Sequence, residues 1–194
     1  MEGKTDRLVV AVTGASGAVA ARLLLDRSPF PVELTASRAG KAVYEQEAGP
    51  FSELARRAAA FHEDDDLSAP IASGSVPTRG MVIIPCSVNT LGKIAAGVCD
   101  SLITRAAHCH LKERRRLVLC VRETPWSYAN ARAAAEATAA GAVVMPMSPP
   151  FYMAEGRDPR EVTMEELLGY YVDRVLALFG RRPPATWADR RAQG

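Results

Sequence analysis

The sequence has 194 residues, which is the length of a single domain. Its 24 lysine and arginine residues nearly balance its 22 aspartate and glutamate residues, so a net charge of +2 excludes an electrostatic clamp on nucleic acid. Hydrophobic residues make up 48% and charged residues 24% of the chain, a globular composition that excludes a disordered protein.

Membrane and export signals are missing from the sequence. No apolar run reaches the roughly 18 residues of a membrane span, and no apolar segment precedes a cleavage site near the first residues. The four cysteines, Cys86, Cys99, Cys109 and Cys120, show no CxxC spacing. We therefore expect reduced thiols in a cytoplasmic protein that binds neither membranes nor nucleic acid.

Short apolar runs alternate with helical patterns along the chain. Strands are predicted at Leu8–Thr13, Pro31–Ala36, Met81–Pro85, Leu117–Val121 and Ala142–Met145. Helical patterns follow each of them, and the last helix is predicted over 163–179 with Thr163 as its cap. Apolar strands followed by helices are typical of a parallel sheet covered on both faces. The sequence thus predicts one doubly wound, Rossmann-like α/β domain over residues 1–180, with 64–77 as a loop and 181–194 as a tail.

The first motif, Thr13-Gly14-Ala15-Ser16-Gly17, lies directly after the first predicted strand. Glycines allow a tight turn, and the first N–H groups of the following helix are expected to be free for an anion. The motif therefore predicts a cradle for a phosphate or a ribityl chain, although a turn without a ligand is the alternative.

Two other enzyme classes fit this motif poorly. Ser37-Arg38 stands where an NAD-binding fold carries an acidic residue, and no Tyr-x-x-x-Lys pair occurs, so an NADP-dependent oxidoreductase is a weak alternative. Ser16 lies in G-x-S-G and not in the G-x-S-x-G elbow of a serine hydrolase.

The second motif, Pro85-Cys86-Ser87-Val88-Asn89-Thr90, follows the third predicted strand. Its hydroxyl, amide and backbone groups lie at another predicted helix N-terminus. Because the carboxyl ends of parallel strands meet at one edge of the sheet, both motifs are expected to face one crevice. Simple helix capping is the alternative for this motif.

Charged and aromatic residues surround the fourth and fifth strands. Most of the basic run 112–116 is interpreted as solvated surface, whereas Arg122 and Glu123 directly follow a buried strand. An arginine there can bind a phosphate, and a carboxylate can move a proton. The proline-rich loop after Met145 orients Tyr152. His108 and His110 alternate on a predicted helix and cannot converge, so no metal site is expected.

Taken together, the motifs resemble those of the UbiX-type flavin prenyltransferases, within the flavoprotein superfamily. The resemblance covers about residues 8–180 and is carried by T-G-A-S-G, A-S-G-S, P-C-S-x-x-T, L-K-E-R-R with R-E-T-P, M-P-x-x-P-x-F-Y and D-R-V-L, in this order. It implies a flavoprotein-type fold, FMN as cofactor, and transfer of a dimethylallyl group from dimethylallyl phosphate to N5 and C6 of reduced FMN. The prenylated FMN would serve a partner UbiD-type decarboxylase, and the chain would form homo-oligomers, as dodecamers in this family.

The resemblance also assigns roles to residues of this chain. The residues that match FMN-binding positions are Gly14, Ala15, Ser16, Ser37, Ser87, Val88, Asn89, Thr90 and Arg122. Those that match positions holding the prenyl phosphate are Lys112, Tyr152 and Arg174, and Trp187 matches a tail tryptophan that closes the site. Ser16, Glu47, Lys112 and Glu123 are the catalytic candidates.

The residue types suit this chemistry. Cleavage of an allylic C–O bond requires stabilisation of the leaving phosphate, which arginine, lysine and a phenol provide without a metal. An allyl cation is stabilised by a pocket that excludes water and offers π faces, such as Trp126 or Trp187. The proton lost on ring closure would go to Glu123 or to the departing phosphate.

The chain departs from the family pattern at two places. The link from Tyr152 to the last helix is about six residues longer, which makes the match of Arg174 less direct, and the helix after Pro125 lacks the common H-x-x-N-M pattern. Two alternative functions stay open. One is an FMN-dependent decarboxylase of cysteinyl substrates, which would need a histidine near the start of the fold, and the other is a non-catalytic FMN-carrying decarboxylase subunit.

Overall fold

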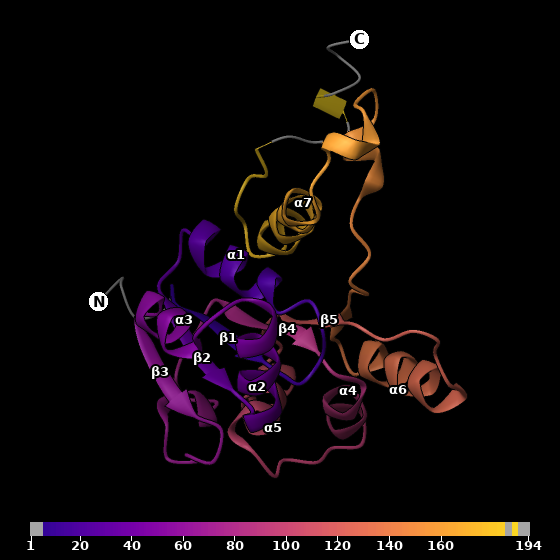
Figure 1. Cartoon of the computed structure of the whole chain (residues 1–194). Helices are drawn as coiled ribbons and strands as arrows, with labels where there is room; N and C mark the ends of the chain where they lie inside the picture. The colour runs from indigo at the N-terminus through magenta and orange to yellow at the C-terminus, as the bar shows by residue number, and fades with distance from the viewer. Residues whose placement is uncertain (1–5, 185–187, 190–194) are drawn as a thin grey trace.

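The computed structural model describes residues 6–184 and 188–189. Its strands form one parallel sheet in the order β3-β2-β1-β4-β5-β6 (Figure 1). The strands are β1 (Leu8–Val12), β2 (Val32–Ala36), β3 (Ala60–Glu63), β4 (Gly80–Cys86), β5 (Leu117–Val121) and β6 (Val143–Val144). The predicted doubly wound α/β fold is confirmed.

The edges of the sheet differ most from the prediction. β3 pairs with β2 from Glu33 opposite Ala60 onward, within a segment that the sequence analysis left without a strand. Its residues are half-buried or exposed, so they lack the apolar run that marks β1, β4 and β5. At the other edge, β6 keeps only two residues of the predicted strand Ala142–Met145.

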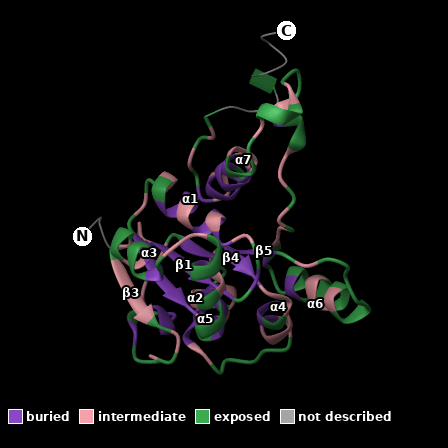
Figure 2. Ribbon diagram, in the orientation of Figure 1, coloured by how far each residue is buried: buried purple, intermediate pink, exposed green. Residues whose placement is uncertain are grey.

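Helices cover both faces of the sheet, as Figures 1 and 2 show. One face packs against α1 (Val19–Arg27), α2 (Arg38–Glu47), α3 (Phe51–Arg57) and α7 (Met164–Ala177). The opposite face packs against α4 (Val88–Ala95), α5 (Leu102–Lys112) and α6 (Tyr128–Ala139). Short 3₁₀ helices are η1 (Pro70–Ala72), η2 (Phe151–Ala154) and η3 (Pro159–Glu161).

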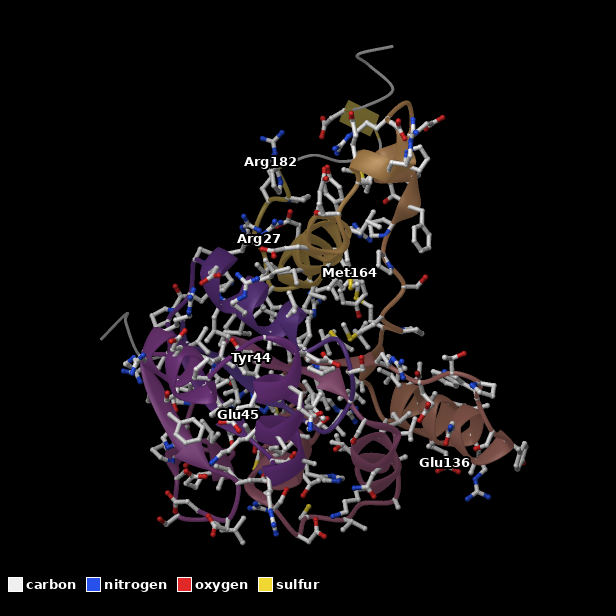
Figure 3. The ribbon with its side chains drawn as sticks, in the orientation of Figure 1. Arg27, Tyr44, Glu45, Glu136, Met164 and Arg182 are labelled. Atoms are coloured by element: carbon white, nitrogen blue, oxygen red, sulfur yellow. The ribbon has the colours of Figure 1, made fainter. Side chains whose placement is uncertain are left out.

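α7 is held against α1 by an ion pair as well as by apolar packing. Asp173 is buried, and Arg27 Nη1 lies 2.8 Å from its Oδ2 atom, between the two helices (Figure 3). Arg181 Nη1 lies 2.5 Å from the other oxygen, so the beginning of the tail is tied to the same carboxylate. The predicted cap of α7 is confirmed, because Thr163 Oγ1 accepts a hydrogen bond from the Glu166 N–H at 3.1 Å.

The strand order fixes where a ligand can enter. β1 is flanked by β2 on one side and β4 on the other, so the chain reverses direction across the sheet between β1 and β4. In open parallel sheets the crevice outside the carboxyl ends of such strands binds ligands. In the part of the chain that is described, none of the helices combines the length and the apolar character needed to cross a bilayer.

Candidate functional site

A cavity of about 550 Å³ lies at the carboxyl ends of β1, β2, β4 and β5. Its lining includes every residue that the sequence analysis matched to FMN binding: Gly14, Ala15, Ser16, Ser37, Ser87, Val88, Asn89, Thr90 and Arg122. Glu123 lines it as well. The two predicted motifs therefore do converge on one crevice, and its volume is in the range of small-molecule sites.

One threonine joins the two motifs. Thr13 Oγ1 donates a hydrogen bond to the Pro85 carbonyl at 2.9 Å and accepts one from the Ser87 N–H at 2.8 Å. Thr13 is buried at the end of β1, so the tie lies at the point where the strand order reverses. The hydroxyl fixes the beginning of α4 relative to the first loop.

The end of β1 and the loop that follows it pack closely against the first turn of α2. A Cβ atom on Gly40 would lie 2.3 Å from the Val12 carbonyl oxygen, and one on Gly14 would lie 2.6 Å from Ala39 Cβ. Glycine at these positions lets the first turn of α2 pack directly on the end of β1. Gly40 was not singled out by the sequence analysis, because the contact joins two separate segments.

Glu47 occupies the anion position that the first motif was expected to leave open. Its Oε2 atom accepts hydrogen bonds from the backbone N–H groups of Gly17 at 2.8 Å and Ala18 at 2.9 Å. Ala18 is the N-cap residue of α1, and its methyl side chain cannot accept a hydrogen bond from the first turn of the helix. The N–H groups of Gly17 and Ala18 are therefore not free for a ligand, since a carboxylate from α2 already occupies this position.

Hydrogen bonding keeps Glu47 ionised. Partial burial raises the pKa of its carboxyl group, but hydrogen bonds from Ser16, Ala18 and Gly17 and the positive charge of Arg122 outweigh this effect and lower the pKa below its usual value. The carboxylate thus holds Ser16 and the first turn of α1 in place, and its charge faces Arg122.

The N-terminus of α5 is closed in a similar way. The Asp64 carbonyl accepts from the Leu102 N–H at 2.7 Å, and Asp64 Oδ1 accepts from the Ile103 N–H at 2.9 Å. The Ser101 hydroxyl accepts from the Thr104 N–H at 3.4 Å in a capping box. No N–H group of this first turn is left for a ligand.

α2 and α4 offer open N-termini instead. Ser37 Oγ accepts from the Gly40 N–H at 3.0 Å, and Ser87 Oγ accepts from the Thr90 N–H at 3.2 Å. The first two N–H groups of α2 belong to Arg38 and Ala39, and those of α4 belong to Val88 and Asn89. None of these four groups has a hydrogen-bond partner among the described residues. Paired free N–H groups at helix N-termini bind phosphate, so this part of the cavity fits the phosphate of FMN.

Arg122 and Glu123 form the opposite part of the lining. The Arg122 N–H donates to the Cys86 carbonyl at 3.1 Å, which extends the pairing of β4 and β5 to the cavity. Glu123 Oε1 accepts from the Thr124 N–H at 2.9 Å, and the Trp126 indole donates to the Glu123 carbonyl at 3.0 Å. These bonds fix the loop, while the guanidinium group of Arg122 remains exposed toward the cavity.

Lys112 and Tyr152, which the resemblance matches to positions holding the prenyl phosphate, do not line the cavity that contains Arg122, so the three side chains form no common pocket within one chain. Lys112 ends α5, whose eleven residues at roughly 1.5 Å each place it about 15 Å from the cavity end of that helix. There its Nζ atom lies 2.5 Å from Glu113 Oε1. The resemblance matches Lys112 by sequence alone and does not say to which cavity the side chain belongs, whereas a helix of a doubly wound fold carries its two ends to opposite edges of the sheet.

The other prenyl-phosphate candidates also lie outside the cavity lining. Tyr152 is in η2 with 44% of its surface exposed, and Arg174 is exposed on α7. Figure 1 shows η2 and η3 extending beyond α7, away from the sheet. Trp187 lies outside the described residues.

Several lining residues were missed by the sequence analysis. They are Arg38, Ala39, Asp64, Lys93, Ser101, Ile103 and Thr104. The S-x-x-T capping signature at Ser101 could have placed a helix start there, but nothing in the sequence connects Asp64 with it. No histidine is among the described residues that line the cavity, and no cluster that could hold a metal ion occurs in that part of the chain.

Comparisons with known proteins show which proteins this chain is similar to in sequence and fold. The flavoprotein family model matches residues 1–163. A flavin prenyltransferase UbiX from Deinococcus radiodurans is 45% identical over 192 residues, which cover 96% of this chain and 95% of the relative. A crystal structure of AnUbiX (PadA1) in complex with FMN and dimethylallyl pyrophosphate has a TM-score of 0.86 and 40% identity, covering 93% of this chain and 96% of that one. A dodecameric FMN-dependent UbiX-like decarboxylase from Escherichia coli O157:H7 has a TM-score of 0.84 and 34% identity, covering 93% and 98%.

Proposed function

Because this chain belongs to the flavoprotein family, and within it to the UbiX flavin prenyltransferases, we propose that it transfers a dimethylallyl group from dimethylallyl phosphate to reduced FMN. The observation that carries the proposal is the cavity itself. Open helix N-termini at Ser37 and Ser87 lie in the same lining as Arg122 and Glu123, so an anion cradle adjoins a charged reaction site.

The FMN phosphate is proposed to bind the first turns of α2 and α4. The hydroxyl groups of Ser37, Ser87 and Thr90 and the free N–H groups beside them supply the donors. The flavin ring would then lie toward Ser16 and Arg122, in the part of the cavity where Glu47 fixes the first loop. Reduced FMN supplies N5 and C6 as the two positions that receive the dimethylallyl group.

The two carboxylates near the flavin position have different tasks. Glu47 accepts from two backbone N–H groups and has a lowered pKa, so it positions Ser16 and balances the charge of Arg122 without taking up a proton. Glu123 has one oxygen bonded to the Thr124 N–H, which leaves its Oε2 atom to accept the proton released on ring closure.

The site is proposed to be completed by other copies of the chain. Lys112, Tyr152 and Arg174 lie outside the lining of their own cavity. A homo-oligomer, with the dodecamer of the Escherichia coli relative as the expected form, would bring these groups to the cavity of a neighbouring copy. There they would bind the phosphate of the prenyl donor and stabilise it as it leaves.

The proposal also covers the C-terminal tail, the partner that receives the product and the cell compartment. The tail 181–194 is proposed to close over a site, beginning from the Arg181–Asp173 ion pair, and the product is proposed to serve a UbiD-type decarboxylase. The four cysteines are free and Cys86, Cys109 and Cys120 are buried, which supports a reducing compartment such as the cytoplasm.

Incubation of the purified protein with reduced FMN and dimethylallyl phosphate under anaerobic conditions tests the proposal. The recovered flavin is expected to gain the mass of one dimethylallyl group in exchange for a hydrogen, and to keep its original mass with heat-denatured protein. Dimethylallyl diphosphate is tried in parallel to identify the donor. An unchanged flavin mass with both donors, despite bound FMN, would point to the FMN-carrier alternative.

A further inference from the structure

A second cavity, of about 400 Å³, adjoins the first at the ends of β2 and β3. Arg38, Asp64 and Ser101 line both cavities, so the two share a wall. The shared residues lie beside the first turn of α2, which is the proposed phosphate end of the flavin site. The second cavity is therefore a space next to that phosphate which a longer ligand could occupy.

The second cavity is dominated by carboxylates. Glu63, Asp64, Asp65 and Asp100 line it, against Arg38 and Lys41. Two of these carboxylates are neutralised, because Glu63 lies 2.5 Å from Lys41 Nζ and Asp100 lies 2.7 Å from Lys93 Nζ. Asp64 and Asp65 form no ion pair with any described lysine or arginine, and Arg38 forms none with a described carboxylate. Two unpaired carboxylates against one unpaired guanidinium group leave a small excess of negative charge in the lining of the second cavity.

The Asp64 carboxylate cannot easily turn away from a ligand. Its Oδ1 atom accepts from the Ile103 N–H at 2.9 Å, and its carbonyl accepts from the Leu102 N–H at 2.7 Å. These two bonds hold the residue between the first turn of α5 and the two cavities. Asp65, the next residue, is exposed and lines only the second cavity.

We infer that Asp64, with Asp65, selects FMN over FAD. The inference rests on the proposed function, in which the FMN phosphate binds the first turns of α2 and α4. FMN ends at this phosphate, whereas FAD carries a second phosphate and an adenosine beyond it. The volume of the second cavity allows such an extension, but fixed carboxylates would repel the second phosphate.

Calorimetric titration of the full chain with FMN and with FAD at low salt tests this inference. The wild type is expected to bind FMN more tightly than FAD. Asp64→Asn keeps an oxygen that can accept from the Ile103 N–H but removes the charge. It is expected to lower the ratio of the FAD Kd to the FMN Kd about fivefold, the effect of one unit charge near a phosphate in a partly hydrated site. The difference between the two proteins should shrink at high salt.

Asp66→Asn is the matched control. Asp66 belongs to the same acidic run, lines neither cavity, and accepts hydrogen bonds from Ser68, so its loss changes the net charge equally without changing the wall. Equal Kd values of the wild type for FAD and FMN, or an unchanged ratio in Asp64→Asn, overturn the selectivity. A wild type that binds neither flavin refutes the proposed function itself.

Discussion

The carboxylate of Glu47, the last residue of α2, lies 2.8 Å from the backbone nitrogen of Gly17 at the beginning of α1. The residue that the family resemblance places among the catalytic groups is therefore also the cap of a helix. This contact explains why the phosphate end of the flavin site is expected at α2 and α4, whose N-termini stay open.

Replacing Glu47 by alanine should destabilise the protein. The free energy of unfolding is expected to fall by about 1 kcal/mol, the usual cost of losing a helix N-cap. Glu45→Ala serves as the control, because Glu45 is exposed on the same helix (Figure 3). Urea unfolding measures both variants, and equal loss in the two would show that the contact with α1 contributes nothing.

The contribution of Glu47 should depend on pH. Its pKa is lowered in the folded protein from an ordinary value of 4.5, so its stabilisation is complete above pH 4.5 and disappears as the pH falls through the folded pKa. The difference in unfolding free energy between wild type and Glu47→Gln is thus expected to be constant near neutral pH and to shrink below pH 4.5. If the difference in unfolding free energy between the two proteins grew as the pH fell, the lowered pKa of Glu47 would be contradicted.

Two buried threonines, Thr13 directly after β1 and Thr35 in the neighbouring β2, should respond oppositely to substitution by valine. Thr13→Val removes the hydroxyl that bonds Pro85 and Ser87, leaving the half-buried Ser87 N–H without its partner, and is expected to cost about 1–3 kcal/mol. Thr35→Val removes a buried hydroxyl that has no hydrogen-bond partner among the described residues, so stability should stay equal or rise. Thermal unfolding of the pair distinguishes them, and equal destabilisation would refute the role of the Thr13 tie.

Ser87→Ala should weaken FMN binding. The hydroxyl caps α4 beside the proposed phosphate, and a hydrogen bond to a charged group contributes about 1.5–3 kcal/mol, so the Kd is expected to rise roughly ten- to hundredfold. Ser68→Ala, in a loop outside the cavity, is expected to bind normally. Quenching of FMN fluorescence measures both. If folded Ser87→Ala bound FMN with an unchanged Kd, the proposal that the FMN phosphate binds at the N-terminus of α4 would be wrong.

Much of the fold could be predicted from the sequence because its central strands are buried on both faces. β1, β2, β4 and β5 consist of buried residues throughout. Apolar runs reveal β1, β4 and β5 directly, whereas β2 also contains Glu33 and Thr35. β3 escaped prediction because Ala60–Glu63 lies at an edge, where pairing with β2 does not require apolar residues.

The cavity lining could be predicted only where a motif lies at a strand end. Glycines and hydroxyl groups after β1, β2 and β4 indicated three loops that do converge. The capping of α1 by Glu47 and of α5 by Asp64 joins residues about 30 to 40 positions apart, and local patterns carry no signal for such contacts. The position of Lys112 likewise depends on the direction of α5, and its proposed role depends on a second copy.

Co-expression of Lys112→Ala with Arg122→Ala tests the central claim most directly. Each variant alone is expected to lose prenyl transfer, because every cavity lacks either its own arginine or the lysine of a neighbouring copy. Mixed oligomers contain interfaces where an intact Arg122 cavity meets an intact Lys112. The flavin recovered from them should therefore regain the added dimethylallyl mass, at a fraction of wild-type turnover. A mixture no more active than the single variants, or full activity of Lys112→Ala alone, would contradict the account.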